Sequence, residues 1–316
     1  LEPGTSVAVA APNSIWATLC FTGVACGGYL ATPLNLVAGA RVLPYVLDHS
    51  EAAVVLCADE CRPLIEDALM AVERPITIIR IDPTNGPVWA QDCDPQATIR
   101  TNPLPDTPGV LMYTSGTTGR PKGVVLSNSN LMAAGMNVVH SHQLQPSDIA
   151  MCILPIYHIN GLCTTIMGTL MSRSGLVMPD RFSVRTFWQF IGDNDVSWFS
   201  AVPTHYAYLL SETTEPEINR SRLRFARSAS APLAPDTHRQ FEDRFGIKII
   251  ETMGLTETGG QILSNPMPPG VVKIGSTGRA VGNEVIIGDD NQTEVGRGST
   301  GEILVRGANV MRGYLK

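Results

Sequence analysis

The sequence predicts an α/β fold with two largely parallel sheets, each covered by helices, and a smaller β-rich unit near the C-terminal end. Short β-type runs alternate with helix-length segments over residues 5–110, and the alternation recurs over residues 109–250. Such alternation is typical of parallel strands joined by helical crossovers. After residue 260 helical periodicity stops, and Gly and Pro recur between short strands. This pattern indicates a small antiparallel or barrel-like unit.

Composition excludes several classes of protein. Of the 316 residues, 44% are apolar and 16% are charged. The charged fraction lies below the usual ~25%, so the chain buries much surface and is not disordered. The net charge of −6 offers no basic face for nucleic acid, and no apolar run approaches the ~18 residues of a membrane span. The seven Cys lack a CxxC pair and stand mostly among apolar neighbours, so we expect reduced thiols and a cytoplasmic protein.

The first part of the chain is predicted to build one parallel sheet. Ser14, or Asn13 before it, is a suitable cap for a helix that runs to about residue 27. Residues 82–107 are rich in proline and read as a surface linker. The remaining expected elements are strands at 6–10, 29–32, 53–57 and 77–80 and helices at 40–48 and 61–72.

The second part repeats this plan. Ser127 or Ser129 caps a helix that ends near residue 140. We expect strands at 109–113, 123–126, 149–154, 175–177, 198–201, 224–228 and 248–251, and helices at 161–171, 183–192, 205–211 and 235–246. Short strands at 284–287 and 301–306 follow. The predicted division is therefore 1–108, 109–260 and 261–316.

The most informative segment is the run Tyr-Thr-Ser-Gly-Thr-Thr-Gly-Arg-Pro-Lys-Gly at residues 113–123. Its glycines let backbone N–H groups approach an anion, its hydroxyls add donors, and Lys122 adds a point charge suited to a polyphosphate. The segment is not a Walker A loop, because Pro121 precedes Lys122 and the loop joins two apolar β-type runs. Composition alone leaves a polar surface loop as the alternative.

This string closely resembles the signature of the adenylate-forming superfamily, which holds acyl-CoA synthetases, nonribosomal-peptide adenylation domains and firefly luciferases. The resemblance implies that the loop binds the phosphates of ATP, and that Lys122 is one of the catalytic groups. The loop residues that it assigns to the nucleotide are Thr114, Ser115, Gly116, Thr117, Thr118, Gly119 and Lys122.

Two further segments resemble nucleotide-site motifs of the same superfamily. Residues 251–257 (Glu-Thr-Met-Gly-Leu-Thr-Glu) are similar to its aromatic-Gly-x-Thr-Glu motif. There the Thr contacts the α-phosphate and the Glu holds Mg²⁺, which makes Thr256 and Glu257 catalytic and Glu257 the metal ligand. Met253 stands where most relatives place an aromatic residue on adenine. The resemblance also assigns Glu251, Thr252 and Gly254 to the nucleotide site, and Gly254 to the acid as well.

Residues 227–233 are similar to the superfamily's Gly-Gly-Ala-Pro-Leu turn, which lines the adenine and acyl sites and implies roles for Ser230, Ala231 and Pro232. Both glycines are replaced here, by Ala229 and Ser230. Residues 154–161 resemble the Pro-x-x-His-x-x-Gly segment, whose histidine, here His158, lies beside the acyl pocket. Residues 301–314 resemble the last segment of the large N-terminal domain.

The resemblance implies two stacked α/β subdomains and a small distorted β-barrel, followed in relatives by a C-terminal lid domain. In relatives a ribose-binding Asp follows the segment that residues 301–314 resemble, then comes a hinge, and the lid supplies a catalytic Lys. This sequence stops before all three. We therefore expect the full protein to carry a lid domain that is absent from this chain.

The implied reaction is an ATP-dependent acid–CoA ligation, in which a carboxylate attacks the α-phosphate of ATP and the resulting acyl-adenylate reacts with CoA. Mg²⁺ and CoA are thus expected beside ATP. Residues 157–162 hold no acidic residue to bind a substrate amine, which argues against an α-amino acid. The alternative is an adenylation domain that loads a carrier-protein thiol. A catalytically dead relative is the third reading, against which Lys122, Thr256 and Glu257 all weigh.

The acid is expected to be small and to carry a second polar or anionic group. Residues 264–276 resemble a subgroup that activates small polar acids such as oxalate, although Gly260 replaces a His that is frequent there. For His205 and Arg227, a helix-start residue and a salt-bridged strand residue are the structural alternatives. Candidate residues for the acid are His158, His205, Arg227, Ser230, Gly254 and Gly260.

Overall fold

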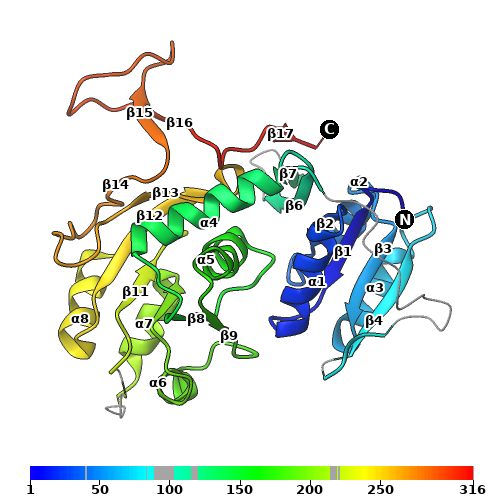
Figure 1. The fold of residues 1–316 in the computed structure, drawn as a ribbon, viewed down its shortest axis with the longest axis horizontal. Helices are drawn as coiled ribbons and strands as arrows, with labels where there is room; N and C mark the ends of the chain where they lie inside the picture. Colours follow the sequence, from blue (N-terminus) through cyan, green and yellow to red (C-terminus); the bar gives the residue numbers. More distant parts are fainter. Residues whose placement is uncertain are drawn as a thin grey trace.

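Two large sheets dominate the computed structural model, which describes residues 1–39, 41–82, 84–88, 103–114, 120–213, 219 and 221–315 (Figure 1). One sheet has eight strands in the order β17-β7-β6-β2-β1-β3-β4-β5, and the other has seven in the order β14-β13-β12-β11-β10-β8-β9. In both sheets the central strands are parallel. Antiparallel strands stand at both edges of the first sheet and at one edge of the second, whose other edge strand, β9, is parallel to β8. The predicted α/β fold with two largely parallel sheets is confirmed.

Strands of the first sheet come from three separate parts of the chain. Parallel pairing places Val7 beside both Ala31 and Val54. The strands are β1 (Ser6–Ala10), β2 (Leu30–Pro33), β3 (Val54–Ala58), β4 (Thr77–Asp82), β5 (Gly86–Pro87), β6 (Pro108–Thr114), β7 (Lys122–Ser127) and β17 (Gly313–Tyr314).

The second sheet holds the strands that follow. Its register sets Arg227 beside Ser200 on the neighbouring strand. The strands are β8 (Ile149–Cys152), β9 (Gly175–Val177), β10 (Trp198–Ala201), β11 (Phe225–Ser228), β12 (Ile249–Leu255), β13 (Gly260–Ser264) and β14 (Arg279–Ala280).

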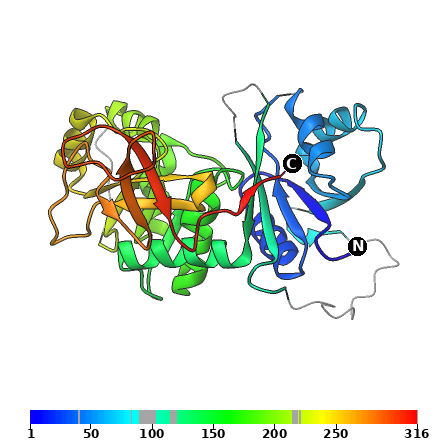
Figure 2. The same ribbon diagram turned by 90° about the horizontal axis from the view of Figure 1, so that it is seen from above.

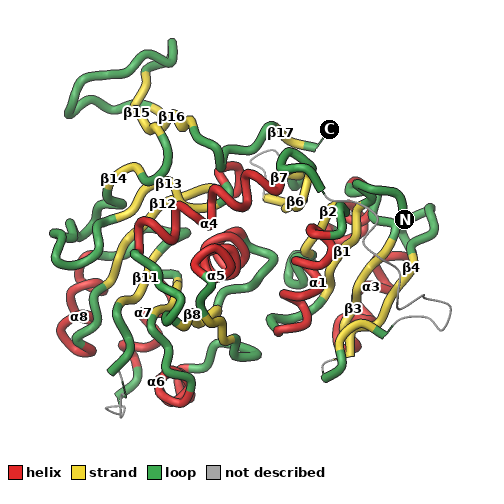
Figure 3. The backbone as a smooth tube through the Cα atoms, viewed as in Figure 1, coloured by secondary structure: helices red, strands yellow, loops and turns green. Residues whose placement is uncertain are grey.

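Helices connect the strands and cover the sheets (Figure 3). The cap predicted for the first helix is observed, because the Ser14 side chain accepts a hydrogen bond from the backbone N–H of Ala17. A π-helical segment, Asn160–Met167, lies between β8 and α5. The α-helices are α1 (Ile15–Cys26), α2 (Val42–His49), α3 (Arg62–Leu69), α4 (Asn128–His142), α5 (Gly168–Ser172), α6 (Val184–Asp193), α7 (Pro203–Ser211) and α8 (Pro235–Phe245).

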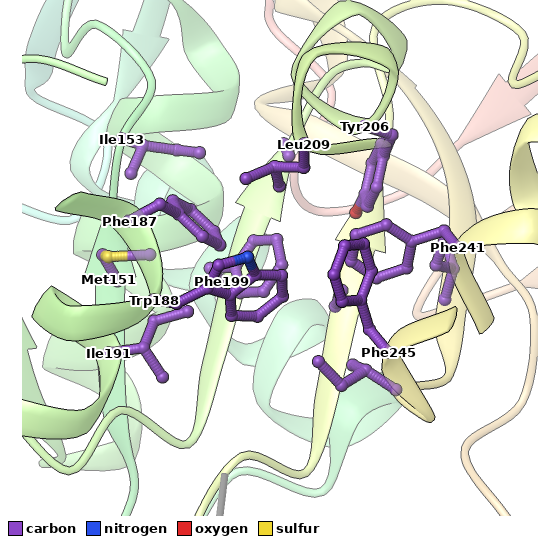
Figure 4. Close-up of a cluster of buried hydrophobic side chains, with 14 of the residues drawn as sticks. Met151, Ile153, Phe187, Trp188, Ile191, Phe199, Tyr206, Leu209, Phe241 and Phe245 are labelled. Atoms are coloured by element: carbon purple, nitrogen blue, oxygen red, sulfur yellow. The ribbon is translucent and has the colours of Figure 1, made fainter. Parts of the chain in front are cut away.

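Clusters of buried apolar side chains show which helices pack on which face of each sheet. Phe21 of α1, Leu131 of α4 and Leu162 of the π-helical segment form one cluster with strands of the first sheet, so these helices lie between the two sheets. On the outer face of the second sheet, Phe199 and Ala226 pack against aromatic and aliphatic side chains of α6, α7 and α8 (Figure 4). The first sheet buries its other face under α2 and α3.

Sheet membership does not follow the ranges expected from the sequence. Strands β6 and β7 were expected to open the second unit at residue 109, but β6 pairs with β2 and completes the first sheet. Strand β13 begins at Gly260 and pairs with β12, so the second sheet continues past that position. The ranges 1–108, 109–260 and 261–316 remain a prediction for the domain boundaries.

The small β unit is a two-stranded antiparallel sheet of β15 (Glu284–Gly288) and β16 (Glu302–Arg306). It projects from the rest of the molecule in Figure 1 and, seen from above, overlies the second sheet (Figure 2). Among the described residues this unit has no further strand, because β14 and β17 pair with the two large sheets. The described residues therefore do not form the closed barrel that was predicted. No helix in the described part of the chain is long and apolar enough to cross a membrane.

Candidate active site

A cavity of about 790 Å³ opens at the carboxyl ends of β8, β10, β11 and β12, opposite the hairpin of β6 and β7. In open parallel sheets the loops after the strands meet at this edge, which is the usual place for a ligand. The cavity brings together eight of the residues predicted from sequence: Thr114, Lys122, His158, His205, Ser230, Gly254, Thr256 and Glu257.

The hairpin positions the base of the phosphate loop. Strands β6 and β7 are antiparallel, and their last pair sets Thr114 opposite Lys122. The loop thus joins two strands, as predicted, and its two ends deliver a hydroxyl and an exposed ammonium group to the cavity. Ser115, Gly116, Thr117, Thr118 and Gly119 lie outside the described residues.

The turn after β12 places Thr256 and Glu257 on the facing wall. The β12–β13 pairing is irregular between Met253 and Gly254. A Cβ at Gly254 would lie 1.9 Å from the carbonyl oxygen of Gly260, so only glycine fits there. The Thr258 hydroxyl bonds to the backbone at Leu255 and Gly260, which closes the turn.

Tyr314, the last residue of the 301–314 segment, lines the cavity but is not among the site residues predicted from the sequence. Its hydroxyl donates to Oε1 of Glu257 at 2.8 Å, and its ring centre lies 5.1 Å from Nζ of Lys122. The hydrogen bond to Glu257 raises the pKa of the Tyr314 phenol. The segment that carries Tyr314 is fixed by Asn130, which donates to the carbonyls of Ala308 and Val310. One aromatic side chain therefore contacts two of the three predicted catalytic residues, Lys122 and Glu257.

Glu257 fits the metal role that the sequence assigns to it. Its carboxylate lines the cavity opposite Lys122, and its described side-chain partner is the neutral hydroxyl of Tyr314. Carboxylate oxygens are the ligands that Mg²⁺ prefers, and Mg²⁺ is commonly held by one or two carboxylates together with phosphates and water. A single carboxylate beside a phosphate-binding loop suits that ion.

The part of the cavity that the resemblance predicts for the acid (the acid side) is lined by two histidines. His158 is exposed on the wall. His205 packs edge-on against Phe182, and its Nδ1 accepts the backbone N–H of Val202 at 3.3 Å. Burial lowers the pKa of His205 to about 4, so the ring is neutral at pH 7. Because Nδ1 is an acceptor, the ring hydrogen resides on Nε2.

Ser230 combines a cavity position with backbone strain. Its φ is +71°, a left-handed conformation that costs a non-glycine residue roughly 1–2 kcal/mol. The superfamily motif has glycine in this turn, and here the serine hydroxyl accepts a hydrogen bond from Nδ2 of Asn160 at 3.2 Å. Strain of this kind is typical of functional positions.

Arg227 does not reach the cavity. Its side chain is 2% exposed, and its guanidinium donates to Oδ1 of Asn160, Oγ of Ser200 and Oε1 of Gln261. The described residues give it no salt bridge, which removes the structural alternative weighed for it. Asn160 does line the cavity. Asn160 is not predicted from the sequence, because a lone Asn before a helix carries no chemical signal without its partners.

Other predicted site residues lie outside the cavity lining. Glu251 is buried, and its Oε1 binds Nδ1 of His238 and the backbone N–H of Gly275. Thr252 is buried and donates to the carbonyl of Ser228. The lining also lacks Ala231, Pro232, Met253 and Gly260, so the ligand contacts assigned to all six remain predictions.

Comparison with protein families decides the relationship. A model described as "AMP-binding enzyme" matches residues 1–315. The chain belongs to the AMP-binding enzyme family. The resemblance read from the motifs to the adenylate-forming superfamily is therefore confirmed.

Two CoA ligases are similar to this AMP-binding chain over 99% or more of its length. The sulfoacetate–CoA ligase of Cupriavidus necator is 40% identical over 319 residues, which take in 100% of this chain and 62% of the relative. The oxalate–CoA ligase of Arabidopsis thaliana is 32% identical over 322 residues, or 99% of this chain and 63% of that protein. The chain thus spans a little over three fifths of the length of these relatives.

Solved structures agree on the fold. ATP-bound MatB from Rhodopseudomonas palustris is 28% identical and superposes with a TM-score of 0.87 over 100% of this chain and 62% of that one. The N-terminal domain of FACL13 from Mycobacterium tuberculosis, at 24% identity, shares the fold with a TM-score of 0.85. The two sheets and their helices are therefore those of the N-terminal domain of adenylate-forming enzymes.

Proposed function

We propose that the protein is an ATP-dependent acid–CoA ligase that activates a small carboxylic acid through an acyl-adenylate. One observation carries the proposal. A single cavity joins the base of the phosphate hairpin, the Thr256–Glu257 turn and the histidine-lined wall after β8 and β10. Nucleotide and acid would therefore meet in one site, as an attack by a carboxylate on the α-phosphate requires.

Each residue has a separate task in this reaction. Lys122 and the Thr114 end of the hairpin would bind phosphate oxygens, and the Thr256 hydroxyl would donate to the α-phosphate. Glu257 would hold Mg²⁺, which supplies charge neutralisation on the phosphates when bound. Because phosphoryl chemistry needs mainly positioning and charge stabilisation, no general base is required of the protein.

The acid is proposed to be short and to carry a second polar or anionic group. His205, Ser230 and Asn160 bring polar atoms to the acid side of the cavity. The relatives named for sulfoacetate and oxalate both act on acids of this kind. The same names support CoA as the acceptor, and a carrier-protein thiol is the competing outcome.

The test is detection of acyl-AMP by mass after the protein that carries this chain is incubated with ATP, Mg²⁺ and a panel of acids. We expect acyl-AMP with short polar acids and acyl-CoA once CoA is added. A best kcat/KM with octanoate or longer acids would contradict the proposed substrate class. Turnover with a phosphopantetheinyl carrier protein and none with CoA would contradict the proposed acceptor.

A further inference from the structure

Behind the acid side of the cavity lies a buried positive charge that has no partner of opposite sign among the described residues. Arg227 of β11 is 2% exposed, and its three described acceptors, on Asn160, Ser200 and Gln261, are all neutral. Burial lowers the pKa of Arg227 to about 9, which leaves the guanidinium protonated at neutral pH. A buried charge that is hydrogen-bonded but not neutralised is costly, and it favours an anion nearby.

Asn160 connects this charge to the cavity. A guanidinium has only donors, so the amide atom that faces it at 2.8 Å is the oxygen Oδ1. The Ser200 hydroxyl donates to the same oxygen at 2.9 Å. Because two donors bind Oδ1, the Asn160 amide cannot flip to exchange its oxygen and nitrogen. Nδ2 therefore points the other way, to Oγ of Ser230 at the cavity wall.

His205 adds a donor on the same wall. Its Nδ1 is occupied by the backbone N–H of Val202, so Nε2 carries the hydrogen. The amide of Asn160 has two hydrogens, of which Ser230 accepts one. Ser230 accepts from Asn160 and can donate its own hydrogen. The wall thus offers N–H and O–H donors from three side chains, and a cation lies directly behind one of them.

We propose that the cavity selects short acids whose second group is an anion, a sulfonate or a carboxylate, through Asn160, which Arg227 orients and polarises. Asn160 is the residue that touches the second anion, and Arg227 is a positioning residue that acts through it. A methyl group in the same place would leave the donors without an acceptor, and a neutral hydroxyl would accept hydrogen bonds but leave the buried charge without a counter-charge. An ammonium group would be repelled. This inference rests on the proposed acid–CoA ligase function.

The experiment compares Asn160→Asp with the wild type in acyl-AMP formation with sulfoacetate, malonate, oxalate and propionate. The wild type should favour the dianions over propionate by about 100-fold or more in kcat/KM, because a site built for hydrogen bonds rejects analogues that lack them. The new carboxylate would pair with Arg227 and remove the donors. The preference for dianions over propionate should then fall by about 100-fold, and Tm should rise.

Asn291→Asp on the exposed loop between β15 and β16 is the matched control and should change neither ratio nor Tm. The ranking of sulfoacetate against malonate and oxalate identifies which anion fits. A wild type that prefers propionate, or an Asn160→Asp protein that folds and keeps the full preference for dianions, overturns the inference and leaves the ligase function standing. A protein that forms acyl-AMP with no acid overturns the proposed function, and this inference with it.

Discussion

Ser230 combines a strained backbone conformation with a polar side chain at the cavity. Its left-handed φ of +71° suits glycine, yet the side chain supplies a hydroxyl to the cavity and accepts from Asn160. A fold optimised for stability alone would place glycine here. We therefore expect the Ser230 hydroxyl to contact the ligand.

Replacing Ser230 by Gly should separate these two effects. We expect the free energy of unfolding to rise by roughly 1 kcal/mol, because the strain is relieved. The KM for the acid should rise about tenfold, because one hydrogen-bonding group is lost. Denaturant unfolding and steady-state kinetics measure the two quantities. Ser299→Gly, at a turn position without positive φ, is the control and should not gain stability.

We expect Tyr314 to orient the Glu257 carboxylate for Mg²⁺ binding. The Tyr314→Phe change keeps the ring near Lys122 and removes the hydrogen bond to Glu257. Groups that orient a metal-binding carboxylate typically contribute 10–100-fold in affinity. We expect the dissociation constant of Mg²⁺ in the ATP complex to rise about tenfold, measured by titration calorimetry. An unchanged constant would show that Tyr314 plays no part in metal binding.

At the scale of elements, the site depends on how β12 is fixed at both ends. At its start, Glu251 binds His238 of α8, whose other ring nitrogen meets Glu242. At its end, the Met253–Gly254 irregularity brings the backbone against Gly260. The turn that holds Thr256 and Glu257 follows directly, so strain in either place would displace it.

The His238 contacts predict a pH-dependent stability. Burial alone would lower the pKa of His238, but the hydrogen bonds to Glu251 and Glu242 outweigh it and raise the pKa. The stabilisation is therefore complete below pH 6.5, the ordinary histidine value, and is lost as pH rises through the raised folded pKa. Compared with His238→Gln, the wild type should lose free energy of unfolding over that range. His140→Gln changes an exposed histidine of α4 and keeps His238, so its free energy of unfolding should follow the same pH dependence as that of the wild type.

Gly254→Ala tests the end of β12. The added Cβ would meet the Gly260 carbonyl oxygen at 1.9 Å, a contact that only a backbone shift relieves. We expect a loss of about 3 kcal/mol or more in the free energy of unfolding, with ATP binding weakened in the protein that remains folded. Gly23→Ala in α1 has no heavy atom within 4 Å of the new methyl group. It should instead stabilise the helix by up to about 1 kcal/mol.

At the scale of the whole molecule, the sequence predicts the individual strands and helices but not which strands pair to form each sheet. The strands 6–10 and 198–201 and the Ser14 cap follow from local signals, namely apolar runs and capping chemistry. Pairing is a long-range property, so nothing local indicated that β6 and β7 join the first sheet. The barrel-like unit was inferred from Gly and Pro content, which indicates short strands but not their closure.

The residues of the candidate site likewise fall into those that the sequence predicts and those that it does not. Lys122, Thr256 and Glu257 stand in long, specific motifs, and the structure brings them to one cavity. Asn160, Tyr314 and Arg227 have side-chain hydrogen-bond partners that are 27 to 70 residues away in the sequence. Their contributions become visible only when those partners are placed. Hydrogen-bond networks of this kind leave no fixed spacing for a sequence to display.

The measurement that tests the account most directly follows isotopic oxygen from the acid. With the acid labelled by ¹⁸O in its carboxylate, attack on the α-phosphate transfers one labelled oxygen to AMP when the thioester forms. We predict labelled AMP and unlabelled pyrophosphate. Labelled inorganic phosphate together with ADP would mean that the acid attacks the γ-phosphate, and would contradict the acyl-adenylate mechanism on which the site assignment rests.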